Sequence, residues 1–154
     1  MEVNIQLLRD NQNYIPILAE SLYHEFARQN ETLDFFTQIL INGCRDNDLP
    51  MFLIATDMQN KILLGTVAIW RCDLMTRQDL FPWLSLLFVK KEYRGHHIGK
   101  ALQEAAIKQA RKQNFTNIYL YTDLCGYYEK TNWHKIGIGI ECDGTEKQLF
   151  MQKL

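Results

Sequence analysis

The chain has 154 residues, of which 47% are hydrophobic and 23% charged, as expected for one globular domain. Lys and Arg number 17 against 18 Asp and Glu, and the net charge of -1 argues against nucleic-acid binding, which usually needs a basic face. No apolar run approaches the roughly 20 residues that span a bilayer, and no secretory signal pattern is present. We therefore expect a cytoplasmic protein with no nucleic-acid or membrane partner.

Apolar periodicity in the first half of the chain predicts a strand, two helices and a β-hairpin. Apolar and polar residues alternate at the start, as in a strand with one buried face. Pro16 suits the first turn of the first helix, and Gly43 suits the end of the second. The predicted elements are a strand over 3–9, helices over 13–30 and 34–42, and hairpin strands over 51–56 and 63–70 around a turn at 57–60.

The second half of the chain predicts strands separated by helices. An apolar strand, a glycine-containing loop, an amphipathic helix and a further strand occupy residues 83–121, which fits a right-handed βαβ crossover between parallel strands. Together the elements predict an α+β, or mixed α/β, fold around a mostly antiparallel sheet. The predicted elements are strands over 83–89, 117–121, 133–140 and 148–152, and helices over 100–113 and 126–131.

The four cysteines are too far apart in the sequence for a paired-cysteine metal clip. We expect them to be reduced thiols, and we expect no bound metal. They are Cys44, Cys72, Cys125 and Cys142.

The loop over residues 90–99 carries the clearest chemical signal. It leads from the apolar strand to a helix N-terminus, where unpaired backbone N–H groups and a partial positive charge favour an anion. Its glycines let the backbone approach a ligand closely, and Arg94 and Lys100 add positive charge. Spacing alone leaves a phosphate-binding loop and a tight connection both open, because the P-loop and dinucleotide-binding patterns are absent.

Two segments resemble motifs of the GNAT superfamily of N-acetyltransferases. Residues 93–102, YRGHHIGKAL, are similar to the family's acyl-CoA-binding motif, and residues 126–133, GYYEKTNW, are similar to its tyrosine-containing segment. Residues 82–84, PWL, resemble a subgroup of small bacterial members. The order of elements also agrees, so the resemblance implies a single acyl-CoA N-acyltransferase domain over residues 1–154.

The resemblance implies a mixed, mostly antiparallel sheet of about six or seven strands, flanked by about four helices, whose central parallel strands splay apart. The splayed strands would be residues 83–89 and 117–121. The pantetheine arm of acetyl-CoA would bind backbone groups of the first of them, and the pyrophosphate would bind backbone amides of the loop. The implied binding residues are Leu87, Phe88 and Val89 on the strand, and Arg94, Gly95, His96, His97, Ile98 and Gly99 in the loop.

The family's chemistry implies an acetyl-CoA-dependent N-acetyltransferase, with direct attack of a primary amine in a ternary complex. Tyr128 matches the family tyrosine that protonates the leaving thiolate, and a backbone N–H of the splayed strand would polarise the thioester carbonyl. Its neighbour Tyr127 is expected to face the core. A covalent acetyl-enzyme on Cys125 is the less favoured alternative.

Three positions depart from the family pattern. His97 stands where the family usually has glycine, so a left-handed backbone there would be strained. Asn132 replaces a second glycine, and asparagine tolerates that conformation better. The loop after strand 117–121 lacks the asparagine that often contacts the cofactor. His97 is the one feature that favours an alternative function, a non-catalytic acyl-CoA-binding sensor or regulatory module on the same fold.

The sequence leaves the general base and the acceptor open. The acceptor is expected to be a small-molecule or peptide amine, and Glu25 and Trp83 are candidate residues for contacting it. A homodimer is allowed, because related proteins often dimerise through C-terminal strands. Besides a water relay, the candidates for the base are His24, Glu25, Asp73, Asp79 and His134.

Overall fold

A seven-stranded mixed sheet organises the computed structural model, which describes residues 1–59 and 61–154. The strand order is β1-β2-β3-β4-β5-β7-β6, and every neighbouring pair is antiparallel except β4 with β5. The mixed, mostly antiparallel sheet is thus confirmed. Its strands are β1 (Val3–Leu7), β2 (Met51–Asp57), β3 (Leu63–Trp70), β4 (Trp83–Val89), β5 (Asn117–Thr122), β6 (His134–Ile140) and β7 (Glu146–Lys153). Asn60, the last residue of the predicted turn at 57–60, lies outside the described residues.

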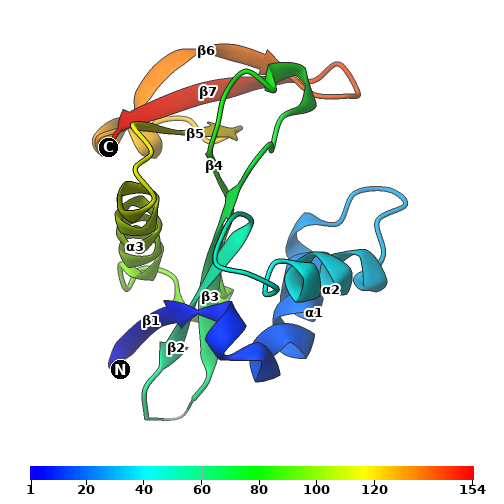
Figure 1. Cartoon of the computed structure of the whole chain (residues 1–154), viewed down its shortest axis with the longest axis vertical. Helices are drawn as coiled ribbons and strands as arrows, with labels where there is room; N and C mark the ends of the chain where they lie inside the picture. Colours follow the sequence, from blue (N-terminus) through cyan, green and yellow to red (C-terminus); the bar gives the residue numbers. More distant parts are fainter. Residues whose placement is uncertain (60) are drawn as a thin grey trace.

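Helices cover both faces of the sheet (Figure 1). α1 (Ile15–Phe26) and α2 (Leu33–Asn42) lie together on one face, and α3 (Ile98–Lys112) lies on the other. The predicted short helix over 126–131 is a single 3-10 turn, η5 (Tyr128–Lys130). Each helix layer closes its own apolar cluster against the sheet. Within the described residues, none of these helices is long and apolar enough to cross a bilayer.

Local chemistry explains where the first two helices begin and end. Pro16 stands in the first turn of α1, where a missing N–H breaks no hydrogen bond. The helix ends at Phe26, earlier than predicted, because Ala27 has ψ of 125° and so leaves the helical region. The side chain of Thr32 then caps α2 by accepting a hydrogen bond from the backbone N–H of Phe35. The α1–α2 loop is therefore short and spans residues 27–32.

The sheet splits between its two parallel strands. β4 and β5 are paired only at Trp83 and Tyr119, and beyond this pair the two strands diverge (Figure 1). β4 also carries a β-bulge, where Leu86 and Leu87 occupy the space opposite one residue of β3, and Leu86 has φ of 49°. The predicted splay of the central strands is confirmed, and it leaves part of the edge of β4 without a neighbouring strand.

Candidate functional site

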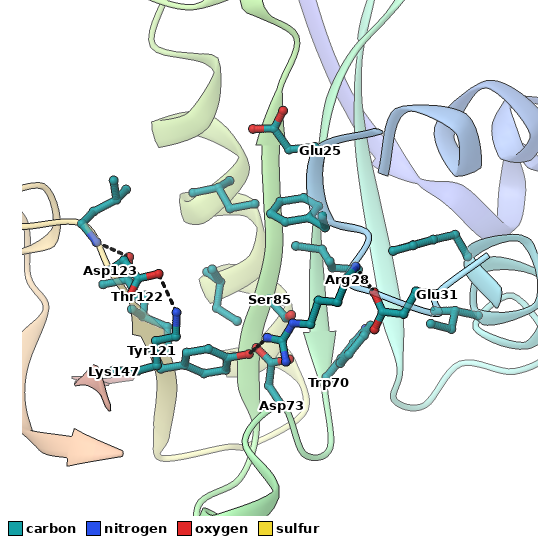
Figure 2. Close-up of a pocket in the computed structure, with 18 of the residues that line it drawn as sticks. Glu25, Arg28, Glu31, Trp70, Asp73, Ser85, Tyr121, Thr122, Asp123 and Lys147 are labelled. Atoms are coloured by element: carbon teal, nitrogen blue, oxygen red, sulfur yellow. Dashed lines mark hydrogen bonds and ion pairs between the residues drawn. The ribbon is translucent and has the colours of Figure 1, made fainter. Parts of the chain in front are cut away.

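A cleft of about 620 Å³ lies at this split (Figure 2). Its walls come from α1, the α1–α2 loop, α2, β4 and β5, so the helix layer and both halves of the sheet contribute. The side chain of Leu87, on the bulge of β4, is part of the wall. Four carboxylates and two cations line the cleft: Glu25, Glu31, Asp73 and Asp123, with Arg28 and Lys147. The residues that line the cleft therefore carry a net negative charge.

Tyr128 lies on the wall of the cleft, in the 3-10 turn after β5. Its side chain packs against the rings of Tyr127, Trp133 and Phe150, and only 6% of the residue is exposed. Burial, and to a lesser extent the neighbouring Tyr127, raise the pKa of the Tyr128 hydroxyl. The hydroxyl therefore stays protonated at neutral pH, as a proton donor must before it acts.

Asp73 is a second titratable group in the cleft. It follows β3, is half-buried, and lies near Ser85 of β4 (Figure 2). Burial raises its pKa to about 6, with a smaller upward effect from Glu141, while Ser85 and Arg28 act in the opposite direction. A carboxylate with this pKa is ionised at neutral pH and is also a better proton acceptor than an ordinary aspartate.

The other candidates for a base differ in position. Glu25 lines the cleft, but its carboxylate pairs with Arg94 at 3.2 Å. His24 and His134 are exposed and do not line the cleft. Asp79 pairs with Arg77 at the surface, and the Arg77 guanidinium lowers its pKa. Among the residues that line the cleft, Asp73 is thus the carboxylate best suited to accept a proton.

The loop after β4 turns into α3 through two left-handed residues. Gly95 has φ of 83° and His97 has φ of 60°, so the strain expected for a histidine in this conformation is present at His97. The loop is held by Arg94, whose Nε donates to the carbonyl of Val89 at 2.9 Å and whose Nη2 donates to Glu25 at 3.2 Å. The first N–H groups of α3 have no carbonyl one turn earlier to bind, an arrangement that favours a nearby negative charge.

Replacing His97 with glycine is expected to stabilise the protein. A left-handed backbone costs a residue with a Cβ about 1–2 kcal/mol, although glycine gives back part of the gain as chain entropy. We expect a net gain of about 1 kcal/mol, or a rise in Tm of about 3 °C. Thermal unfolding of His97→Gly and His97→Ala checks this. Alanine retains the strain, so an equal rise in both variants would assign the effect to loss of the imidazole.

Gly99, in the first turn of α3, is a glycine that the protein's own packing does not require. Its φ is outside the left-handed region, and a Cβ built on it would meet its nearest atom, the Tyr127 hydroxyl, at 3.5 Å. Glycine in a helix is less stable than alanine. The space beside its backbone therefore suits the close approach of a ligand to the N-terminus of α3.

Two sequence predictions about aromatic residues are wrong. Trp83 is completely buried, and its Nε1 donates to the carbonyl of Leu80, so it packs in the core and cannot contact an acceptor. Tyr127 is 44% exposed rather than in the core, and its hydroxyl accepts a hydrogen bond from Gln103 at 3.3 Å. Tyr128 is the buried member of the pair, because the tight 3-10 turn directs the two neighbouring rings differently.

The remaining predicted residues lie along the edge of β4 and the start of α3. The side chains of Phe88 and Ile98 are buried in the two apolar clusters, so only their backbone groups are available to a ligand. Val89 ends β4, and His96 is exposed, with its Nδ1 within 3.2 Å of two backbone carbonyls. Asn132 is not among the left-handed residues, so no special backbone demand falls on it.

Sequence reasoning missed Arg28, Tyr121 and Glu141. Arg28 donates to both carboxylate oxygens of Glu141, at 2.8 and 3.2 Å, and to the hydroxyl of Tyr121 at 3.4 Å. Burial, Asp73 and Glu141 raise the pKa of that hydroxyl. These residues come from three distant segments, and no local spacing links them. Within the described residues, no cluster of histidine, cysteine or acidic side chains is placed to hold a metal ion.

Comparison with known proteins gives a match to one family model and shows which solved structures share the fold. The model of the acetyltransferase (GNAT) family matches residues 14–133, and no curated protein matches the sequence. An aminoglycoside 6'-N-acetyltransferase crystallised with coenzyme A has 17% identity and a TM-score of 0.76 over 99% of this chain and 97% of that one. The NatC complex bound to Gag peptide and CoA has 17% identity and a TM-score of 0.74 over 100% and 99%. The spermidine/spermine N-acetyltransferase of Vibrio cholerae, in mutant forms, has 16% identity and a TM-score of 0.70 over 99% and 95%. At these identities the similarities show a shared fold.

Proposed function

The chain belongs to the GNAT family of acetyltransferases, and from this premise we propose that it transfers the acetyl group of acetyl-CoA to a primary amine by direct attack. The observation that carries the proposal is the cleft at the split of β4 and β5, with Tyr128 and Asp73 both on its wall. One group is suited to donate a proton and the other to accept one, as acetyl transfer to an amine requires.

The edge of β4 is the proposed binding site for the pantetheine arm. The split leaves backbone groups beyond the pair of Trp83 and Tyr119 without a strand partner on that side. An extended chain that carries amides can add to such an edge as another strand does. Phe88 pairs with Thr66 of β3, so the backbone of Leu87 and the N–H of Val89 would supply these hydrogen bonds on the open edge, and two of the similar structures were crystallised with CoA.

The start of α3 is the proposed pyrophosphate site. The amides from Gly95 to Gly99, His96, His97 and Ile98 among them, lie where the helix dipole favours negative charge, whereas the amide of Arg94 donates to the carbonyl of Lys91 at 3.3 Å. Because the Arg94 side chain is bound to Val89 and Glu25, we assign it the role of holding the loop. Backbone amides then provide most of the binding.

The reaction proposed for the cleft moves two protons. The acceptor nitrogen forms a bond to the thioester carbonyl carbon, and a backbone N–H near the bulge of β4 stabilises the charge on the oxygen. Asp73 takes the proton that the nitrogen loses. As the carbon–sulfur bond breaks and negative charge develops on sulfur, Tyr128 gives its proton to the sulfur, and the released thiol, with an ordinary pKa of about 8.5, keeps that proton at neutral pH. Tyr128 recovers its proton, and Asp73 releases one, through solvent.

Calorimetric titration with acetyl-CoA and CoA, combined with thiol release over a panel of amines, tests the proposal. We expect both ligands to bind and thiol release to depend on an amine. If CoA binds but no amine causes thiol release, the protein would be an acyl-CoA-binding sensor rather than an enzyme. Absence of CoA binding would remove the proposed function altogether.

Replacing Gly99 with alanine is expected to change stability and cofactor binding in opposite directions. Alanine stabilises the first turn of α3 by about 0.5 kcal/mol, because its Cβ makes only ordinary contacts within the protein. The same Cβ occupies the space where the pyrophosphate would approach the backbone, so the Kd for CoA should rise at least about tenfold. Thermal unfolding and calorimetry on one preparation check both effects. Unchanged CoA affinity would contradict the assigned position of the pyrophosphate.

A further inference from the structure

Arg28, on the wall of the cleft, forms an ion pair with Glu141, which is not among the residues that line the cleft. Arg28 lies in the α1–α2 loop, and Glu141 lies directly after β6, 113 residues further along the chain. The pair is bidentate, with N–O distances of 2.8 and 3.2 Å. Figure 2 shows the Arg28 side chain reaching from the loop that carries Glu31 toward Tyr121, with Asp73 beside its guanidinium. One side chain thus spans the space that an acceptor would enter.

The two partners of this pair differ sharply in exposure. The side chain of Glu141 is 8% exposed, whereas that of Arg28 is 54% exposed. The carboxylate is therefore buried behind the Arg28 guanidinium, which belongs to a loop and can move into water. A buried carboxylate that loses its cation is strongly destabilised. If Arg28 leaves, another positive group has to replace it on Glu141.

The surrounding wall indicates what would carry that positive group. Beside the charged residues, the acceptor side is mostly aromatic and aliphatic, including Phe26, Phe35 and Trp70. Such a surface suits methylene groups, and its aromatic rings also attract cations. The electronegative lining of the cleft favours an acceptor with more than one positive charge.

We infer that the acceptor is an aliphatic amine with a second cationic group, which replaces the Arg28 guanidinium on Glu141 while the reacting nitrogen lies at Asp73. The placement of the reacting nitrogen rests on the proposed function. In the free protein, Arg28 occupies the subsite for the second charge. An amine with a single charge makes no contact with Glu141 and leaves Arg28 in place.

Two amines of equal chain length test the inference in the unmodified protein. Thiol release from acetyl-CoA is measured with n-butylamine and with 1,4-diaminobutane, and diamines of other chain lengths then locate the best spacing. We expect a KM for 1,4-diaminobutane at least about tenfold below that for n-butylamine. Equal KM values for the two amines, or a clear preference for an aminoglycoside, would overturn the inference.

Variants of the two partners are expected to have opposite effects. Glu141→Gln should raise the KM for 1,4-diaminobutane to that of n-butylamine, whereas Arg28→Ala should lower it severalfold because the subsite is vacated. Arg28→Lys, which retains a cation, serves as the matched control, and Arg77→Ala breaks a surface pair outside the cleft. If Glu141→Gln and Arg28→Ala both raise the KM for the diamine alike, the pair only supports the structure and the inference fails.

A binding measurement separates this inference from the proposed function. Arg28→Ala should have a lower Tm, and 1,4-diaminobutane without CoA should restore it more than n-butylamine does. If the diamine restores Tm but no amine releases thiol, the subsite stands and the proposed function fails. If every amine releases thiol with the same KM and neither restores Tm, the proposed function stands and the inference fails.

Discussion

Replacing Tyr128 with phenylalanine is expected to lower kcat for acetyl transfer about 100-fold, the usual loss when a general acid is removed. The variant retains the ring, which packs against Trp133 and Phe150, so the Kd for acetyl-CoA and the Tm should change little. The thiolate then leaves without a proton from the protein. Steady-state thiol release with a saturating amine measures the effect.

A second tyrosine provides the control for this variant. Tyr119, on β5, packs against Trp83 and does not line the cleft, so Tyr119→Phe should retain full activity. If kcat of Tyr128→Phe is within about twofold of the wild-type value, Tyr128 is a packing residue and solvent protonates the thiolate.

Replacing Asp73 with asparagine is the second large expected effect. Because burial raises the pKa of Asp73 to about 6, kcat/KM of the wild-type protein should fall as the pH drops through about 6, where the carboxylate becomes protonated. Asparagine cannot accept the proton, so kcat/KM should fall about 100-fold at neutral pH. The acidic limb of the profile near pH 6 should also disappear. Thiol release between pH 5 and 9 measures both.

The matched control is Asp79→Asn, which changes a surface aspartate paired with Arg77. It should leave the pH profile unchanged. Histidines titrate in the same range, so His24→Gln and His134→Gln are included. An acidic limb that persists in Asp73→Asn and disappears in one of these histidine variants would transfer the role of base to that histidine.

The parts of the site that depend on backbone were predictable from the sequence. The loop before α3 works through amides and a helix N-terminus, so its glycines and its position between strand and helix leave a local pattern. The left-handed strain at His97 was predictable for the same reason, since it follows from one residue standing at a glycine position. The strands β3 and β4 also have the predicted bounds, because their apolar runs are strong and uninterrupted.

The acceptor side of the cleft was not predictable in the same way. Arg28, Asp73 and Glu141 meet only through the packing of a loop, a strand end and a hairpin, and each alone resembles a solvated surface residue. Trp83 was misassigned because an aromatic residue on a central strand suits a pocket wall and a core equally well. Its pairing with Tyr119 at the one point where β4 and β5 meet placed it in the core.

The single pairing between β4 and β5 has a consequence for how the molecule opens. The strands β1 to β4 form one continuous hydrogen-bonded ladder, and β5, β7 and β6 form another. Residues from both ladders share one apolar cluster under α3, including Leu84 and Phe150. The two ladders are therefore joined mainly by side-chain packing, with backbone hydrogen bonding only at the pair of Trp83 and Tyr119, and each can behave as a cooperative unit of its own. A ligand that hydrogen-bonds to β4 between them would couple the two units.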